Sequence, residues 1–151
     1  MKGTVLKKIL LLSFVLLCCF FVMLLWQFIK PEAKLAESKI AEKQVDDFIL
    51  HMRVNETEKG IQVLQSIQYV GKEIVEIKHQ SPLVSVSLLN RNHDYTGSTV
   101  SKALKKGDVY PGEEIIFPSP KKGECNLYLQ ARFNVNGEEV SIDHVEKLFF
   151  E

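Results

Sequence analysis

Five side chains beyond the first thirty residues are of types that bind metal ions or transfer protons: His51, His79, His93, His144 and Cys125. Structural zinc sites use ligands in closely spaced pairs, such as two cysteines or two histidines a few residues apart. Each of these five residues stands far from the next one in the sequence. The spacing therefore predicts no metal site, and no phosphate-binding or dinucleotide-binding motif is present to indicate a cofactor.

The segment 119–122 matches the S-x-x-K motif of serine nucleophiles by its letters alone. That motif belongs at a helix start, where the lysine returns one turn later beside the serine. Here Pro118, Pro120 and Gly123 predict a loop. Each acidic pair of the chain consists of two consecutive residues. On a strand, two consecutive side chains point to opposite faces of the sheet, so the two carboxylates do not converge. The sequence thus predicts a non-catalytic protein with no catalytic residues.

Two predicted loops hold the candidates for contact with a partner protein: His93, Asp94 and Tyr95 in one, Lys121 and Lys122 in the other. Tyr95 stands among Asn, Asp, Gly and Ser. An aromatic ring in such a loop can bury a large area at low cost in conformational entropy. The alternative is that the ring covers one end of the domain. The two interpretations predict opposite effects on stability when Tyr95 is replaced.

Strands must position these loops, and the sequence after residue 54 predicts them clearly. From Cys125 to Val135, apolar residues alternate with polar ones, as in a strand with one buried face. Asn136-Gly137 follows, and both residues tolerate the positive φ of a two-residue type I′ turn. The pattern predicts a hairpin in which Phe133 lies opposite Val140.

Five to seven such strands without intervening helices indicate a small all-β antiparallel sandwich over residues 54–151. Residues 109–117, VYPGEEIIF, resemble a turn that leads into a strand in bacterial immunoglobulin-like domains. The resemblance covers this segment alone. It implies an immunoglobulin-like sandwich, and a domain of this size can bury an adequate core without disulfides.

Residues 9–29 form an apolar run in which only Ser13 and Gln27 are polar. As a helix that rises about 1.5 Å per residue, the run would span the roughly 30 Å hydrocarbon core of a bilayer. No small-residue cleavage site follows it. We expect a single transmembrane helix that acts as an uncleaved signal anchor. Lipidation of Cys18 or Cys19 is the alternative, although leucines stand where lipoprotein signals carry small residues.

Lysines within residues 1–8 predict a cytoplasmic tail and an extracytoplasmic C-terminal domain in the cell membrane, although lysines beyond the run leave the reverse orientation open. From Lys30 onward, 16 Lys and Arg residues stand against 19 Asp and Glu, a net charge of −3. A nucleic-acid-binding domain would carry a clustered basic face. Cys125 is the only cysteine after the run, which fits a bacterial envelope better than a disulfide-rich secreted protein. The expected partners are the lipid bilayer, through residues 9–29, and an envelope protein.

Residues 30–53 predict a juxtamembrane amphipathic helix, because Pro31 suits a first turn and apolar residues recur at helical spacing: Ala41, Val45, Phe48, Ile49 and Met52. Its apolar face would pack on the β-domain or, alternatively, self-associate. An apolar helix followed by an amphipathic helix and a sheet resembles the pilin architecture, so a pilin-like or secretion-apparatus assembly subunit is the alternative function. The chain departs from that family in lacking the Gly-Phe-Thr-Leu-x-Glu processing site and in carrying Pro31.

Overall fold

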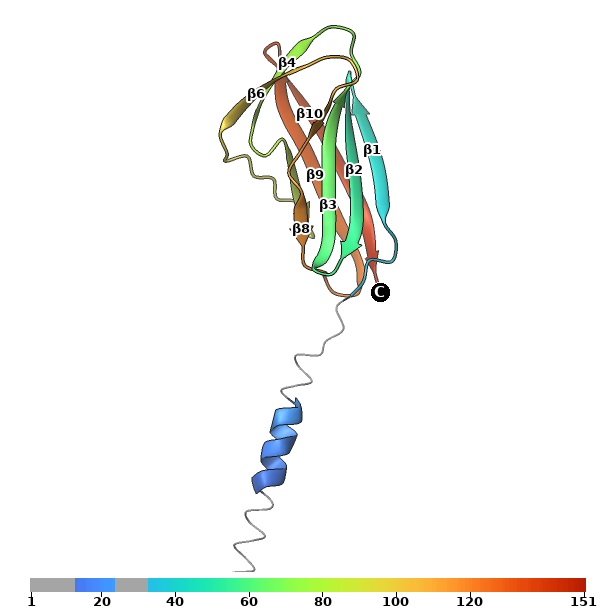
Figure 1. Ribbon diagram of the computed structural model, residues 1–151, viewed down its shortest axis with the longest axis vertical. Coiled ribbons are helices and arrows are strands. Elements are labelled where there is room, and N and C mark those ends of the chain that lie inside the picture. The colour runs from blue at the N-terminus through green and yellow to red at the C-terminus, as the bar shows by residue number, and fades with distance from the viewer. Residues whose placement is uncertain (1–12, 24–32) are drawn as a thin grey trace, which may run out of the picture. The chain divides into compact units, whose positions relative to one another are not determined.

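A computed structural model describes residues 13–23 and 33–151 (Figure 1). Residues 13–23 form a helix whose apolar side chains are exposed, with Phe14 65% and Met23 71% accessible. Within the described residues, no helix combines the length and the apolar character needed to cross a membrane. The predicted cytoplasmic tail (1–8), the rest of the apolar run (9–12 and 24–29) and residues 30–32 lie outside the described residues.

Residues Ala33–Glu151 form a compact unit that contains ten strands. In chain order the strands are β1 (Lys39–Val45), β2 (Phe48–Thr57), β3 (Gly60–Tyr69), β4 (Val75–Gln80), β5 (Val84–Leu88), β6 (Thr99–Leu104), β7 (Val109–Pro111), β8 (Ile115–Phe117), β9 (Gly123–Val135) and β10 (Glu138–Phe150). This unit begins at Ala33, so the predicted start of the β-domain at residue 54 is too late.

The ten strands form two antiparallel sheets. One sheet has the order β1-β2-β3-β7, and β8 also pairs with β3. The other has the order β10-β9-β4-β6, and β5 also pairs with β9. β4 and β5 pair with successive parts of β9, and β7 and β8 with successive parts of β3. β4 and β5 therefore follow the path of one interrupted strand, and so do β7 and β8. The two sheets confirm the predicted antiparallel β-sandwich.

The predicted hairpin is confirmed in its register: Phe133 lies opposite Val140 in the β9–β10 ladder. Asn136 and Gly137 form its turn with φ values of 52° and 90°, the two positive values that a type I′ turn requires. The register follows from the alternation of side chains, because a slip by one residue would turn every buried side chain of β9 outward.

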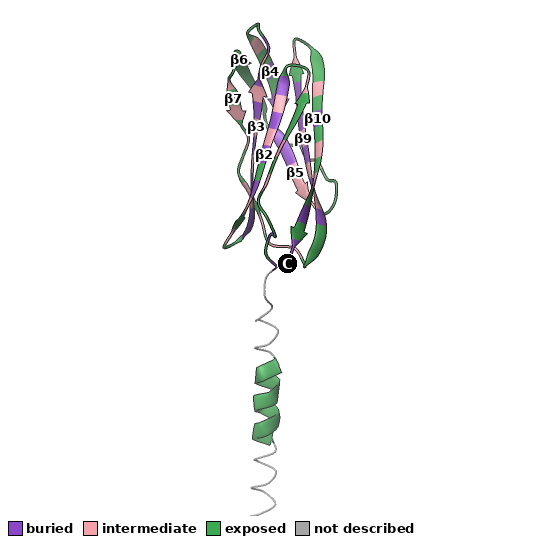
Figure 2. Ribbon diagram, turned by 90° about the vertical axis from the view of Figure 1, so that its right-hand side faces the viewer, coloured by how far each residue is buried: buried purple, intermediate pink, exposed green. Residues whose placement is uncertain are grey.

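The core lies between the two sheets, where Figure 2 shows buried residues along the facing strands. β2 contributes alternate side chains from Phe48 to Val54, and β9 contributes alternate side chains from Cys125 to Phe133. The Phe48 ring meets the Phe133 ring edge to face, with centroids 4.8 Å apart. Burial of these two inner faces supplies the main stabilising term, at about 25 cal/mol per Å² of apolar surface.

The predicted juxtamembrane helix over residues 30–53 is wrong wherever the structure describes that segment. β1 and β2 form a hairpin there, and β2 pairs along its whole length with β3. Phe48, Leu50 and Met52 are buried, whereas Ile49 is only half-buried. The segment therefore buries every second residue, as a strand does, because pairing with β3 outweighs the helix propensity of its Ala, Glu and Lys residues. The described residues of this segment contain no helix through which the expected self-association could occur.

Candidate binding site at the tip of the sandwich

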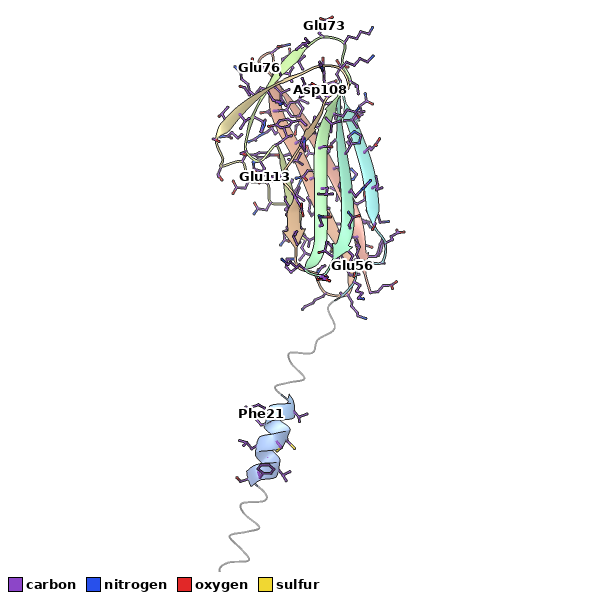
Figure 3. The ribbon with its side chains drawn as sticks, viewed as in Figure 1. Phe21, Glu56, Glu73, Glu76, Asp108 and Glu113 are labelled. Atoms are coloured by element: carbon purple, nitrogen blue, oxygen red, sulfur yellow. The ribbon has the colours of Figure 1, made fainter. Side chains whose placement is uncertain are left out.

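Four turns meet at one end of the sandwich, here called the tip: residues 46–47, 70–74, 105–108 and 136–137. Glu73 and Asp108 lie at this end in Figure 3, and Glu56 lies at the opposite end, here called the base. The chain enters the domain at the base and also ends there, since Leu35 forms a bridge with Phe150. The tip is therefore the end of the domain farthest along the strands from both of its termini.

Local sequence explains why the chain reverses at the tip. Asp46 adopts a φ of 49° between β1 and β2, a left-handed conformation that Asp tolerates better than most residues. Gly107 adopts a φ of 90° between β6 and β7. In the β3–β4 turn, a Cβ atom added to Gly71 would lie 2.2 Å from the Tyr69 hydroxyl oxygen. A side chain at position 71 would therefore have to displace the Tyr69 ring, which is almost fully buried.

Backbone hydrogen bonds join three of these turns, 46–47, 70–74 and 105–108, into one platform. The Val70 N–H donates to the Asp47 carbonyl oxygen at 2.8 Å, which ties the β3–β4 turn to the β1–β2 turn. The Tyr69 N–H donates to the Asp108 carbonyl oxygen at 3.0 Å, and the Gly107 N–H donates to the Tyr69 carbonyl oxygen at 2.8 Å. The surface is therefore preorganised, and a partner would order little of it on binding.

A hollow of about 830 Å³ opens between the turns. Apolar and aromatic side chains from both sheets lie beneath it: Phe48, Tyr69, Val75, Val135 and Val140. Phe48 and Tyr69 are almost fully buried, and their ring centroids are 5.1 Å apart. An apolar centre enclosed by polar groups is the arrangement found in protein interfaces.

The rim of the hollow carries four carboxylates and two ammonium groups: Asp46, Asp47, Glu73 and Glu138 against Lys72 and Lys106. Among the described residues, no ion pair joins any two members of this rim. Burial raises the pKa of the Tyr69 hydroxyl, and the nearby carboxylates of Asp47 and Glu73 raise it further. The rim is therefore net acidic, and it suits a partner surface that presents basic side chains around an apolar residue.

Tyr95, the aromatic candidate from the sequence, lies away from the tip. It belongs to loop 89–98, which packs on the outer face of β5 and β9. Its hydroxyl donates to the Gln130 carbonyl oxygen at 2.5 Å, and the Arg132 guanidinium lies 4.5 Å from the ring centroid. Only 9% of Tyr95 is exposed. These contacts favour the packing interpretation over that of an exposed interface anchor.

His93 and Asp94 share that loop. The two ring nitrogens of His93 are buried and have no hydrogen-bond partner within residues 13–23 and 33–151. Burial lowers the pKa of His93, and the Arg91 charge lowers it further. The Asp94 side chain is exposed, while its backbone N–H donates to the Ser85 hydroxyl oxygen at 3.2 Å. Asp94 is thus the member of this trio with an exposed functional group.

Lys121 and Lys122 are exposed in the turn between β8 and β9, at the base. The described hydrogen bonds and ion pairs include none that joins either lysine to loop 89–98. The structure therefore leaves the two predicted candidate loops separate. The sequence indicates turn residues such as Asn136-Gly137. It does not show that the four tip turns lie at the same end of the domain, because that depends on the directions of the strands.

The described histidines likewise lie apart in the fold. His51 contacts Glu42 and Gln68 on the outer face of one sheet, and His79 contacts Tyr110 between the sheets. His144 contacts Glu146 on β10, which is an edge strand. Within the described residues, no group of three or more His, Cys, Asp or Glu side chains is arranged to hold a metal ion. The described histidines therefore form no common site.

The chain matches no known protein-family model, and no curated protein matches it significantly.

Proposed function

We propose that this chain is a single-pass membrane protein of a bacterial cell envelope whose extracytoplasmic β-domain binds another envelope protein without catalysing a reaction. The single observation that carries the binding role is the hollow at the tip, where four turns enclose an apolar floor. The membrane anchor is supported by the apolar run of residues 9–29, in which only Ser13 and Gln27 are polar. The described part of that run exposes its large apolar side chains, which is costly in water.

The strand order supports an immunoglobulin-like arrangement. β2, β3 and the interrupted strand β7/β8 correspond to strands A, B and E of such domains, with β1 as an additional strand. β10, β9, the interrupted strand β4/β5 and β6 correspond to G, F, C and C′. Immunoglobulin variable domains carry their binding loops at the end that holds the B–C and F–G loops. The corresponding loops here are 70–74 and 136–137, and both belong to the tip.

The acidic rim gives the proposed partner its chemistry. A basic patch on an envelope protein would meet the carboxylates of Asp47, Glu73 and Glu138, and an apolar side chain at its centre would enter the hollow. Rim charges act mainly on the rate of association and its salt dependence, whereas the buried centre contributes most of the affinity. The bridge between Leu35 and Phe150 places both ends of the β-domain at the base, so neither end of the domain covers the tip.

The pilin-like alternative loses the feature that suggested it. It relied on an amphipathic helix over residues 30–53, and strands β1 and β2 occupy the described part of that segment. We therefore retain the membrane-anchored binding module as the proposed function.

Photo-crosslinking in intact bacteria tests the binding role. A photoreactive amino acid at Lys72, on the rim of the tip, should give an adduct of one discrete mass. The matched control is Lys59, an exposed lysine in the β2–β3 turn at the base, which should give none. The tip variant Glu73→Lys should weaken the Lys72 adduct, and Glu56→Lys at the base should leave it unchanged. Equal adducts from Lys72 and Lys59 would contradict binding at the tip.

Protease accessibility tests the topology. Protease added to intact protoplasts should digest residues 33–151, either when the β-domain opens locally or at a moderately raised temperature. A small N-terminal fragment should survive. Complete protection of the β-domain, lost on lysis, would mean that the domain is cytoplasmic.

A further inference from the structure

The two long sides of the sandwich differ in whether the chain covers the gap between the two sheets. On one side β1 lies against β10, and the chain before β1 pairs with the end of β10. The Lys34 N–H donates to the Glu151 carbonyl oxygen at 3.0 Å, and the Glu151 N–H donates back to the Lys34 carbonyl oxygen at 2.9 Å. Ala33 and Leu35 are buried there. This side of the core is closed by the domain's own chain.

The other side is open between β5 and β8. Within the described residues, each of these strands pairs on one edge alone, β5 with β9 and β8 with β3. β6 continues the sheet beyond β4 but stops where Thr99 pairs with Gln80, so it does not cover β5. A groove of about 540 Å³ lies between β5 and β8. An unpaired strand edge is a template on which another chain can form a strand.

The free edge of β5 can be identified from its hydrogen bonds. The Leu89 N–H donates to the Asn126 carbonyl oxygen at 2.9 Å, which continues the ladder between β5 and β9. Because residues of an antiparallel strand bond alternately to one side and the other, the backbone groups of Val84 and Val86 point away from β9. Val86 lines the groove, whereas Val84 is fully buried, so of the two only Val86 can offer its backbone groups to a guest.

Loop 89–98 runs beside β5 without occupying this edge. The Asp94 and Asn92 N–H groups donate to the hydroxyl oxygens of Ser85 and Ser87, both at 3.2 Å, instead of to backbone carbonyls. In the part of the chain that the structure describes, backbone hydrogen bonds of the loop reach Ser81 and Leu88 but neither Val84 nor Val86. The loop thus forms one wall of the groove and leaves backbone donors and acceptors for a guest.

The groove has a defined chemistry. Its apolar side chains are half-buried and come from both sheets: Val86, Leu88, Ile115 and Phe117. Its charged lining residues are Asp94 and Glu113, both exposed, and neither takes part in an ion pair among the described residues. Among the residues that the structure describes, no basic one lines the groove. The lining is therefore complementary to a guest that carries both apolar and basic side chains.

We infer that this groove binds an extended peptide segment of a partner protein, in which apolar residues alternate with lysine or arginine. The segment adds a strand to the free edge of β5 at Val86. Its apolar side chains pack on Val86 and Phe117, and its basic side chains meet Asp94 and Glu113. Strand addition of this kind takes affinity from backbone hydrogen bonds and specificity from alternate side chains. The groove is separate from the tip, so this inference goes beyond the proposed function.

The probe is a synthetic peptide of about nine residues in which valine alternates with lysine, added to the full-length protein in detergent micelles. Amide hydrogen exchange is followed by NMR. Exchange of the Val86 amide should slow by about tenfold at saturation, because a bonded amide exchanges only on opening. Exchange in the tip turn at Gly137 should not change. A peptide with glutamate in place of lysine should not protect Val86.

Two substitutions test the charge complementarity. Asp94→Asn and Glu113→Gln should each weaken binding of the lysine peptide about two- to fivefold, the range of an exposed ion pair. The matched control Glu73→Gln, on the rim of the tip, should leave peptide affinity unchanged. Because the control alters only the tip, failure in the groove and failure of the tip proposal are distinguishable.

Several outcomes would overturn the inference. These are unchanged exchange at Val86 with millimolar peptide, equal binding of the glutamate peptide, and protection at the tip in place of β5. Protection of Val86 that rises with protein concentration in the absence of peptide would overturn it as well, because the edge would then pair with a second copy of the chain.

Discussion

The rings of Phe48 and Phe133 meet edge to face between the two sheets, one from β2 and one from β9, with centroids 4.8 Å apart. Phe133 is 1% exposed, and Phe48 is 4% exposed. Phe133→Ala should therefore lower the free energy of unfolding by about 3–5 kcal/mol, the usual cost of removing a buried aromatic side chain. Urea denaturation measures this change. Asn134→Ala, at the next and outward position of β9, is the control and should change it by less than about 0.5 kcal/mol.

Tyr95→Phe should lower the free energy of unfolding by about 1 kcal/mol. The substitution keeps the ring beneath loop 89–98 but removes the hydroxyl that donates to Gln130, and a hydrogen bond of this kind contributes about that much. Tyr128→Phe is a suitable control because Tyr128 is only half-buried and its hydroxyl accepts a 3.3 Å bond from Asn126. Equal stability of wild type and Tyr95→Phe in urea denaturation would return Tyr95 to the set of candidate partner-binding residues.

The domain should lose stability as the pH rises from about 10 to about 12. Burial is the main cause that raises the pKa of Tyr95 from 10.0 to about 12. Between these values the unfolded chain releases the phenolic proton and the folded chain keeps it, so the folded state binds more protons and stability falls with pH. The contribution of Tyr95 is fully present below pH 10. Urea denaturation across this range should show a shallower decline in Tyr95→Phe, and an unaltered decline would contradict the assignment.

Gly137→Ala should destabilise the β9–β10 hairpin by about 1–2 kcal/mol. Gly137 has a φ of 90°, and an added Cβ would meet no atom within 4 Å. The cost would therefore come from the backbone conformation, which L-residues with a side chain rarely adopt. Asn136→Gly is the matched control at the neighbouring position, whose φ is 52°, and it should be nearly neutral. A thermal melt distinguishes the two variants.

Local sequence pattern is enough to predict some parts of the domain. The β9–β10 register follows from two signals within one short segment, the alternation of apolar residues and the Asn136-Gly137 turn. Most of the strands after residue 54 follow from the same alternation. β6 was not predicted, because its residues Thr99–Leu104 are mostly exposed and bury only Leu104.

Tertiary structure decided the segment before residue 54. There, Ala41, Val45 and Phe48 recur at helical spacing among good helix formers, while Phe48, Leu50 and Met52 alternate as in a strand. Both periods are present, so local propensity could not choose between them. The ladder with β3 did, because it provides backbone partners for β2 and buries its alternate side chains.

The candidate sites were also decided by tertiary structure. The partner of the Tyr95 hydroxyl lies 35 residues away at Gln130, and the tip unites turns that are separated by up to about 90 residues. The sequence identified turn residues at several of these places. It could not show which turns share an end or which strand edges stay unpaired, because those features depend on strand direction and on pairing between distant segments.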